Sequence, residues 1–530
     1  MNGLKRVLYP AVLCALLTLG CSNPASASKQ VLRLNFCNEP ATLDPRKGGD
    51  VISTALHFFL YEGLTRLTPK GPTEPGVAEE ILISDDGLHY EFRLRHSSWS
   101  DGHPVTAFDF EHAWKSMANP TFPCPNAHLL YPIKNAFLAK QGKVSVNSIG
   151  VKAVSPYVLL VDLEQPTPYF LELCAFAVLH PVPKHLAKGN THWTEKDALV
   201  SNGPFHLKEL KHNQAIILEK NARYWEGDKV SLEEIQISLV ENTMTALHLF
   251  EKGELDMLGG SFTRLPDDAL TSLKESNEFI SYSVPGSSNL SFNTKRWPMS
   301  DARFRRALGS AIGREMIVDN ITKLFEDPAY DLIHPSLKPS SNQTRFESVD
   351  FDETLTEMGI TRNDLPPITL FYSRTDLSHN VAQTIQQQWI EKLGLRVQLA
   401  CFEHKILLNR LIQGDYQIAM FGIRAQYMDP MNILERFTHR DNPKNYANWY
   451  HPDYERLIAS ASTEPNQERR LSLLTKAEQI ILHEMPMAPV FHWRAALLQQ
   501  PHVKNLYISP FGSLYMQEIV IDLDEKASNR

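Results

Sequence analysis

Strand-like and helix-like patterns alternate between residues 368 and 420, and this alternation constrains the fold of the 530-residue chain more than any other feature. Strand patterns cover 368–372, 395–399 and 416–420, and helical patterns cover 379–393 and 405–413. Gly394 and Gly414 stand where the two helices should end. Elements of this length and order build parallel β-α-β units with right-handed crossovers, so the sequence predicts an α/β lobe.

The segment 421–430 follows the last of these strands and reads Phe-Gly-Ile-Arg-Ala-Gln-Tyr-Met-Asp-Pro. Open α/β lobes bind their ligands at the carboxyl ends of their strands. We therefore expect a binding site near this segment, at the edge of the lobe where the strands end.

A strand, a turn and a helix are predicted between residues 288 and 318. Apolar and polar residues alternate over 290–293, and Pro298 ends the strand pattern because it has no N–H group to donate. Ser300 or Asp301 can cap the helix that follows. The expected apolar face of this helix comprises Phe304, Ala307, Leu308, Ala311, Ile312 and Met316, and the opposite face carries most of Arg303, Arg305, Arg306 and Arg314.

Residues 1–20 have the pattern of a signal peptide. Lys5 and Arg6 precede an apolar run at 7–19, and this run is shorter than the ~20 residues that a membrane-spanning helix needs. No later hydrophobic run approaches that length. The sequence thus predicts an exported chain whose remaining part is soluble.

Gly20 and Cys21 resemble a lipoprotein cleavage box, in which the cysteine is acylated and becomes the new amino terminus. We expect Cys21 to be the lipid anchor and residues 21–30 to be the lipid-anchored tether, because several acyl chains bind a membrane stably. If this box is not used, the chain would be an ordinary secreted protein cut near Ala25 or Ala27.

Composition and motifs argue against several classes of function. The net charge is −8 and there is no long basic run, so nucleic acid is not expected as a partner. Gly-x-Ser-x-Gly, a zinc-binding His pair on a helix and a phosphate-binding glycine loop are all missing, so no metal, cofactor or catalytic residue is expected. Four cysteines, Cys37, Cys124, Cys174 and Cys401, could pair in three ways or stay free.

The run from Asn293 to Glu315 resembles the motif of the large extracellular solute-binding proteins of peptide ABC transporters. It reads Asn-Thr-Lys-x-x-Pro-x-x-Asp-x-Arg-x-Arg-x-Ala-Leu-x-x-Ala-Ile-x-Arg-Glu. The resemblance extends from about Val31 to Ile521. Further matching segments are Glu39–Pro45, Tyr61–Thr65, Trp99–Phe110, Pro181–Leu186, Gly203–Phe205, Asn221–Trp225, Gly253–Asp256 and Met485–Phe491.

This resemblance implies a two-lobed periplasmic-binding-protein fold of the α/β class, with mixed sheets, a hinge and an extra small domain. It places lobe I at residues 31–50, 185–283 and 493–530, domain II at 51–184 and lobe III at 284–492. Such proteins hold an extended peptide by adding it as a strand to exposed sheet edges, and the lobes then close over it. The resemblance therefore implies an oligopeptide ligand, an inner-membrane ABC permease as partner, and a monomeric protein without enzymatic activity in the periplasm or cell envelope.

The same resemblance locates the ligand site. It puts one edge strand near 37–43 and a second near 421–424, and it suggests an aromatic-like position at His404. The candidate ligand-binding residues are Asn38, Glu39, Pro40, His404, Gly422, Ile423, Arg424, Gln426, Asp429 and Arg410, of which Arg424 and Arg410 would bind a ligand carboxylate.

Gln426 departs from the family pattern. In oligopeptide and dipeptide binders an Asp stands here, four residues before Pro430, and receives the ammonium group of the ligand. A buried ammonium without a counter-charge is costly, and glutamine offers only a carbonyl dipole. Either Asp429 or another acid supplies the charge, or the ligand has no free amino end here. The alternatives are a binder of modified or cell-wall peptides or of a non-peptide solute, and, from another class, an exported peptidase or an envelope interaction protein.

Overall fold

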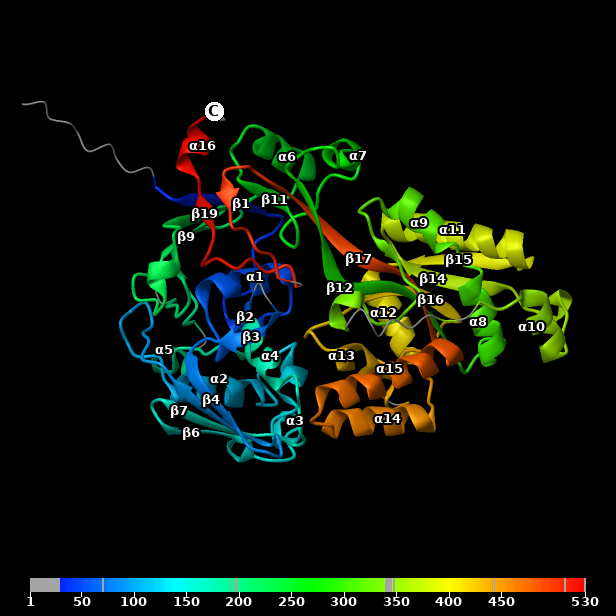
Figure 1. Ribbon diagram of the computed structural model, residues 1–530, viewed down its shortest axis with the longest axis horizontal. Coiled ribbons are helices and arrows are strands. Elements are labelled where there is room, and N and C mark those ends of the chain that lie inside the picture. Colours follow the sequence, from blue (N-terminus) through cyan, green and yellow to red (C-terminus); the bar gives the residue numbers. More distant parts are fainter. Residues whose placement is uncertain are drawn as a thin grey trace, which may run out of the picture.

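The computed structural model describes residues 29–68, 71–190, 192–195, 199–338, 346, 348–440, 442, 444–509 and 511–528. The predicted signal peptide, Cys21 and most of the tether lie outside these residues. Figure 1 shows two halves, with lobe I and domain II on the left and lobe III on the right. Among the described helices, none has both the length and the hydropathy to cross a bilayer.

Lobe I is built on a four-stranded sheet. Its strands, in spatial order, are β1 (Val31–Phe36), β10 (Glu234–Leu239), β9 (Ala215–Lys220) and β8 (Phe205–Lys211). β1 runs parallel to β10, and the other pairs are antiparallel. Alternate residues such as Leu32, Leu34, Ile216 and Ile235 are fully buried, as expected for a sheet that covers a core with one face.

Domain II is a second four-stranded antiparallel sheet packed on α2 (Ala107–Met117). Its order is β4 (Ala78–Ile83), β5 (His89–Leu94), β7 (Val158–Asp162) and β6 (Val151–Ser155). Thr106 and Asp109 form a capping box at the start of α2, which satisfies free N–H groups of its first turn. Phe110 and Trp114 of α2 are buried against the sheet.

Lobe III contains the predicted parallel unit. β14 (Ile368–Ser373), α11 (Asp376–Leu393), β15 (Val397–Phe402), α12 (His404–Gln413) and β16 (Ile418–Arg424) follow in this order, and β14 pairs in parallel with both β15 and β16. Gly394 and Gly414 end the two helices with φ of 67°. A left-handed conformation of this kind has no steric cost for glycine, and the predicted helix ends are confirmed.

Two long strands join the halves. β12 (Phe279–Phe292) and β17 (Met487–Gln499) pair with each other and run from lobe I into lobe III (Figure 1). Their register shifts between Ser283 and Ser287. The predicted lobe boundaries at 283/284 and 492/493 fall in this irregular part of the pair. They stay predictions.

The predicted single helix after Pro298 is wrong in three respects. Met316, expected on its apolar face, is 42% exposed. The helix is divided into α8 (Ala302–Ser310) and α9 (Arg314–Ile317). Arg305 and Arg314, expected at the surface, are 2% and 1% exposed. Both donate to main-chain carbonyls that sequence spacing does not reveal. Arg305 reaches the oxygens of Met299, Glu484 and Met485, and Arg314 reaches those of Gly309, Ala329 and Pro489.

The remaining α-helices and β-strands lie around these sheets. Further helices are α1 (Val51–Leu60), α3 (Ala136–Lys140), α4 (Phe170–Cys174), α5 (Lys184–Ala187), α6 (Thr243–Glu251), α7 (Leu270–Leu273), α10 (Phe351–Met358), α13 (Met431–Leu434), α14 (Pro452–Thr463), α15 (Gln467–Glu484) and α16 (Leu523–Ser528). Further strands are β2 (Thr65–Thr68), β3 (Gly71–Pro75), β11 (Met257–Gly259), β13 (Asp327–Pro328), β18 (Val503–Lys504) and β19 (Val520–Ile521). Cys37, Cys124, Cys174 and Cys401 are all free thiols.

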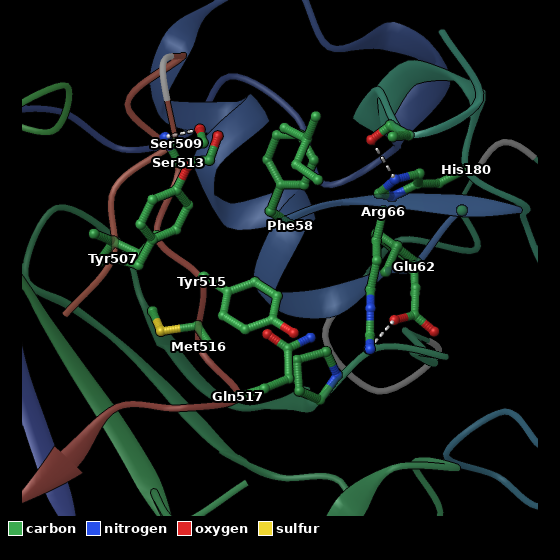
Figure 2. A pocket seen from close by; sticks show the side chains of 16 residues that line it. Phe58, Glu62, Arg66, His180, Tyr507, Ser509, Ser513, Tyr515, Met516 and Gln517 are labelled. Carbon is green, nitrogen blue, oxygen red and sulfur yellow. Dashed lines mark hydrogen bonds and ion pairs between the residues drawn. The ribbon is translucent and has the colours of Figure 1, made fainter. Parts of the chain in front are cut away.

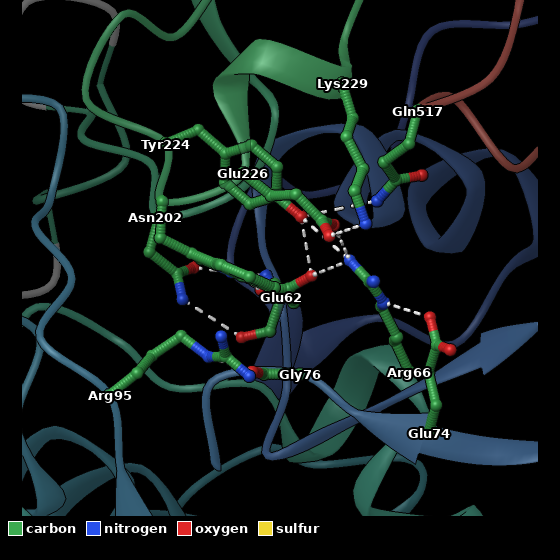
Figure 3. Close-up of polar contacts among 11 residues, drawn as sticks. Glu62, Arg66, Glu74, Gly76, Arg95, Asn202, Tyr224, Glu226, Lys229 and Gln517 are labelled. Atoms are coloured by element: carbon green, nitrogen blue, oxygen red, sulfur yellow. Dashed lines mark hydrogen bonds and ion pairs between the residues drawn. The ribbon is translucent and has the colours of Figure 1, made fainter. Parts of the chain in front are cut away.

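A buried polar network joins several of the segments that carried the family resemblance (Figure 3). Glu62, which follows α1, is 4% exposed and accepts hydrogen bonds from Tyr224 Oη at 2.7 Å and from Trp225 Nε1. Its main chain exchanges two hydrogen bonds with the Asn202 amide, at 3.0 and 3.2 Å. Arg66 then links Glu62 to Glu226 and Glu74. These matching segments therefore have a structural role, because they hold lobe I to domain II.

Candidate ligand cleft

Three neighbouring cavities, which share lining residues, lie between and beside the lobes. We call them the lobe III cavity, the central cavity and the domain II cavity, with volumes of about 540, 420 and 530 Å³. Arg436 lines all three. The central cavity is walled by α1, by Asn126 and His128 of domain II, by Arg424 to Gln426 of lobe III, and by Phe511 to Ser513 of the carboxyl-terminal segment. The cavities thus form one cleft between the lobes.

The end of β16 offers an open sheet edge to this cleft. β16 pairs with β12 over its whole length, but it pairs with β14 only at Ile418 and Ala419. The three residues that follow, 420–422, line the lobe III cavity. A glycine is needed at 422 because a Cβ there would overlap the Trp493 ring. An extended chain could therefore pair with the free side of β16.

Gln426 joins lobe III to domain II at the position where the family pattern has an acid. Its Oε1 lies 2.8 Å from His128 Nε2, and its Nε2 lies 3.4 Å from Asn126 Oδ1. Partial burial lowers the pKa of His128, which keeps the imidazole neutral at pH 7 and able to donate to Gln426. The residues around Gln426 therefore satisfy its amide, and they add no negative charge.

Three cations line the central cavity without a carboxylate partner. Among the described residues, no ion pair within 4.0 Å involves Arg424, Arg436 or Lys444. Arg424 donates to the Phe511 carbonyl at 2.7 Å, and Arg436 Nε is buried without a hydrogen-bond partner. Burial lowers the pKa of all three groups. The cavity therefore has a positive potential, which favours an anionic group.

The acids near these cations form no ion pair with them. Among the described residues, Asp50 is the one acid that lines the central cavity, and its side chain caps α1 by accepting from Ser53 N at 2.8 Å. Glu435 lies beyond ion-pair distance of Arg436 and Lys444. Burial raises its pKa to about 6, so its carboxylate is largely ionised at pH 7 and offsets part of their charge. No carboxylate of the described residues contacts Arg436 or Lys444, so both can still bind an anionic group of a ligand.

Two further contacts join domain II to lobe III. The Tyr169 and Tyr427 rings are stacked, with centroids 4.1 Å apart and planes 10° apart. Glu172 Oε2 accepts a hydrogen bond from Met428 N at 2.8 Å. Burial raises the pKa of Glu172 to about 7, and the charge of Asp429 contributes. The lobes therefore touch on the domain II side of the cleft.

The structure brings Gly422, Arg424, Gln426 and His404 to the cleft. His404 is the first residue of α12 and lines the lobe III cavity, with Nδ1 3.4 Å from Ser373 Oγ. Their roles in binding stay predictions.

The other predicted residues line none of the three cavities. Asp429 is buried, and its carboxylate is held by Arg470 at 2.6 and 2.8 Å, so it is already neutralised. Arg410 pairs with Asp415 at 2.6 Å, and Ile423 belongs to the lobe III core. Asn38 and Pro40 flank Glu39, which accepts from His212 Nδ1 at 2.7 Å and Asn213 N at 2.9 Å.

Sequence reasoning missed His128, Tyr169, Arg436 and Lys444. The first two belong to domain II and reach the cleft only through the tertiary fold. Arg436 and Lys444 follow the 421–430 segment, so a search for basic residues just beyond the last parallel strand could have found them.

A fourth pocket lies between lobe I and domain II and differs from the cleft. It has a volume of about 60 Å³ and is lined by Tyr507, Tyr515 and Met516 of the carboxyl-terminal segment together with Phe58 and His180 (Figure 2). A space of this size holds a few water molecules and no peptide. We therefore place the ligand in the cleft.

A chain of two α/β lobes, joined by long strands and enclosing a cleft, has the architecture of a periplasmic solute-binding protein. The comparisons with known proteins agree. Residues 73–445 match the family model of the bacterial extracellular solute-binding proteins, family 5 Middle. The chain belongs to this family.

Relatives and solved structures give the same result. The oligopeptide-binding protein OppA of Bacillus subtilis is 35% identical over 505 residues, which cover 93% of both chains. The unliganded open form of the murein tripeptide-binding protein MppA has a TM-score of 0.80 at 26% identity, covering 93% of this chain and 98% of that one. OppA of Haemophilus influenzae in complex with the peptide RPPGFSPFR has a TM-score of 0.76 at 25% identity, covering 93% and 99%.

Proposed function

We propose that this protein captures oligopeptides in the cell envelope and delivers them to an inner-membrane ABC permease. The observation that carries the proposal is the free edge of β16 beside the lobe III cavity. Family membership and the names of the relatives support it. Main-chain hydrogen bonds along such an edge are the same for every peptide sequence, so they allow broad specificity.

The charges in the cleft suggest which end of the ligand is recognised. Arg424, Arg436 and Lys444 would bind a carboxylate or another anionic group of the peptide. Gln426, with His128 and Asn126, offers no counter-charge to a free ammonium. The favoured ligand is therefore a peptide that is anionic and has its amino end blocked or placed elsewhere. Modified and cell-wall peptides fit this description, and a non-peptide anion is the alternative.

Closure of the lobes would bury the ligand. The β12 and β17 pair is the only described β-ladder that runs from lobe I into lobe III. Its register shift between Ser283 and Ser287 lies where the two strands pass from one lobe to the other. Bending at this irregular segment would bring the lobes together, and the Tyr169 and Tyr427 stack and the Glu172 contact supply an interface on one side.

The location and partners follow from the sequence and the proposed role. A signal peptide at 1–20 would direct export and then be removed. Acylation of Cys21 would hold the protein, as a monomer, at a membrane close to its permease. No role in catalysis is proposed for any residue of the cleft.

The test is to incubate the purified protein with a pool of tri- to pentapeptides and to identify the retained ligands by mass spectrometry. Half of the pool carries acetylated amino ends. Retention of intact peptides supports a binding protein. Release of shorter fragments would favour an exported peptidase, and retention of neither half would overturn the peptide proposal.

A further inference from the structure

Three side chains far from the cleft converge on the surface near the junction of domain II and lobe I. Asp101 Oδ2 lies 3.0 Å from His103 Nδ1 and 2.8 Å from His185 Nε2. The two imidazole rings are stacked, with centroids 4.1 Å apart and planes 27° apart. One nitrogen or oxygen from each residue lies within 4.8 Å of the other two. Three potential ligand atoms thus lie close together.

Both segments that carry these residues are held in position. Gly102 adopts φ of 94° in the turn between Asp101 and His103, a conformation that favours glycine. Asp109 of α2 accepts a hydrogen bond from Thr106 N at 2.8 Å and another from Lys184 N at 2.8 Å. One carboxylate therefore fixes the chain just after His103 and just before His185, although the two histidines are 82 residues apart. The cluster does not depend on mobile chain ends.

Its donor set is that of a transition-metal site. Two imidazole nitrogens and one carboxylate oxygen are typical ligands of Zn²⁺ and related borderline ions, whereas Mg²⁺ and Ca²⁺ prefer oxygen alone. Ligand atoms around a tetrahedral zinc ion, with bonds of ~2.0–2.1 Å, lie about 3.3 Å apart. The observed 2.8 and 3.0 Å separations are hydrogen-bond distances. Metal binding would therefore replace the two hydrogen bonds, turn the lone pairs of both imidazole nitrogens to the ion by a change of tautomer, and move the ligand atoms slightly apart.

We propose that Asp101, His103 and His185 bind a divalent transition-metal ion, with zinc as its probe. His103 is 60% exposed, so a fourth coordination position faces solvent and would take water. The ion would fasten the turn at 101–103 to α5. This site is independent of the peptide cleft and of the function proposed for it.

The experiment is calorimetric titration of the untagged, chelator-treated mature protein with ZnCl₂, together with the visible absorption of the Co²⁺ form. We expect one strong site whose Co²⁺ spectrum shows tetrahedral coordination. Removing even an outer-shell partner of a metal ligand weakens binding by about 10-fold or more, so His103→Ala and His185→Ala should each weaken it by at least that factor.

The control is His89→Ala. His89 Nδ1 lies 2.7 Å from Asp162 Oδ1 on the same domain, but the described residues provide no second imidazole to complete a site there. This variant should bind zinc as the parent does. No strong site, or equal loss in the control and the two cluster variants, would show that the three residues are only a hydrogen-bonded cluster and would overturn the proposal. Circular dichroism of each variant checks the fold.

Discussion

The junction of lobe I and domain II and the cleft both bury charged side chains, but the charges have partners only at the junction. Around Glu62, the carboxylate has partners in Tyr224, Trp225 and Arg66, and Arg66 in turn has Glu226 and Glu74 (Figure 3). Around Arg436, the cavity holds three cations and no ion pair among the described residues.

The difference separates structure from binding. A buried charge is tolerated when neighbours of opposite charge and hydrogen bonds replace water. The Glu62 network meets this condition by itself, so it stabilises the junction of lobe I and domain II. Arg424, Arg436 and Lys444 have no carboxylate of the described residues within 4.0 Å, and a bound anion would supply that partner. A partly dehydrated cation that the protein leaves unpaired is therefore a guide to the ligand.

The largest effect should come from breaking the paired network. Glu62→Ala leaves Arg66 with less counter-charge and removes the acceptor of the Tyr224 and Trp225 donors, so we expect a loss of ~3–5 kcal/mol in the free energy of unfolding. Urea unfolding followed by fluorescence measures this. Glu74→Ala is the control, since the Glu74 side chain is 41% exposed, and it should cost less than ~1 kcal/mol. Similar losses in both would contradict a special role for Glu62.

Two arginines of lobe III sharpen the comparison. Arg470 is paired with Asp429, whereas no carboxylate of the described residues forms an ion pair with Arg436. Arg470→Met leaves Asp429 buried alone and should cost about 3 kcal/mol, whereas Arg436→Met removes an unneutralised charge and should change stability by less than ~1 kcal/mol. Thermal unfolding of both variants without ligand distinguishes them. A large loss for Arg436→Met would mean that this residue has a structural partner.

The domain II side of the cleft should respond to pH. The pKa of Glu172 is about 7 in the folded protein, above its ordinary value of 4.5. The folded state therefore binds the proton more strongly, so the contribution of Glu172 to stability is complete below pH 4.5 and is lost as pH rises through 7. We expect a loss of ~2–3 kcal/mol between pH 5 and pH 8 from this group.

Glu172→Gln should remove that part of the pH dependence, and unfolding curves at several pH values measure it. Glu80→Gln, which changes an exposed acid, serves as the control. If the parent and Glu172→Gln have the same pH dependence, the carboxyl group is not dehydrated at the interface.

Local patterns predicted much of the fold. The parallel unit at 368–420 and the helix ends at Gly394 and Gly414 depend on residues within a short stretch of chain, and the structure confirms them. Tertiary contacts decided the rest. Arg305 and Arg314 are buried because distant carbonyls accept from them, and no helical spacing shows this.

The candidate site was predictable to a similar degree. The binding segment at 421–430 could be located because it lies at and beyond the end of β16, the last parallel strand. The partners of its side chains could not, because they come from far away in the chain. Gln426 meets His128 from domain II, and Asp429 is neutralised by Arg470, 41 residues later. Sequence reasoning offered Asp429 as a possible counter-charge for the ligand, and the ion pair leaves it without that capacity in this structure.

The central claim is that the unpaired cations select an anionic ligand. The direct measurement is calorimetric titration of the parent and Arg436→Met with one peptide in three forms, namely free at both ends, acetylated at the amino end, and amidated at the carboxyl end. For the parent we expect acetylation to change the affinity by less than about threefold and amidation to weaken it by about 10- to 100-fold, since a lost charged hydrogen bond costs ~1.5–3 kcal/mol. Arg436→Met should lose most of this discrimination. Strong binding of the amidated form together with loss of the acetylated form would contradict the account.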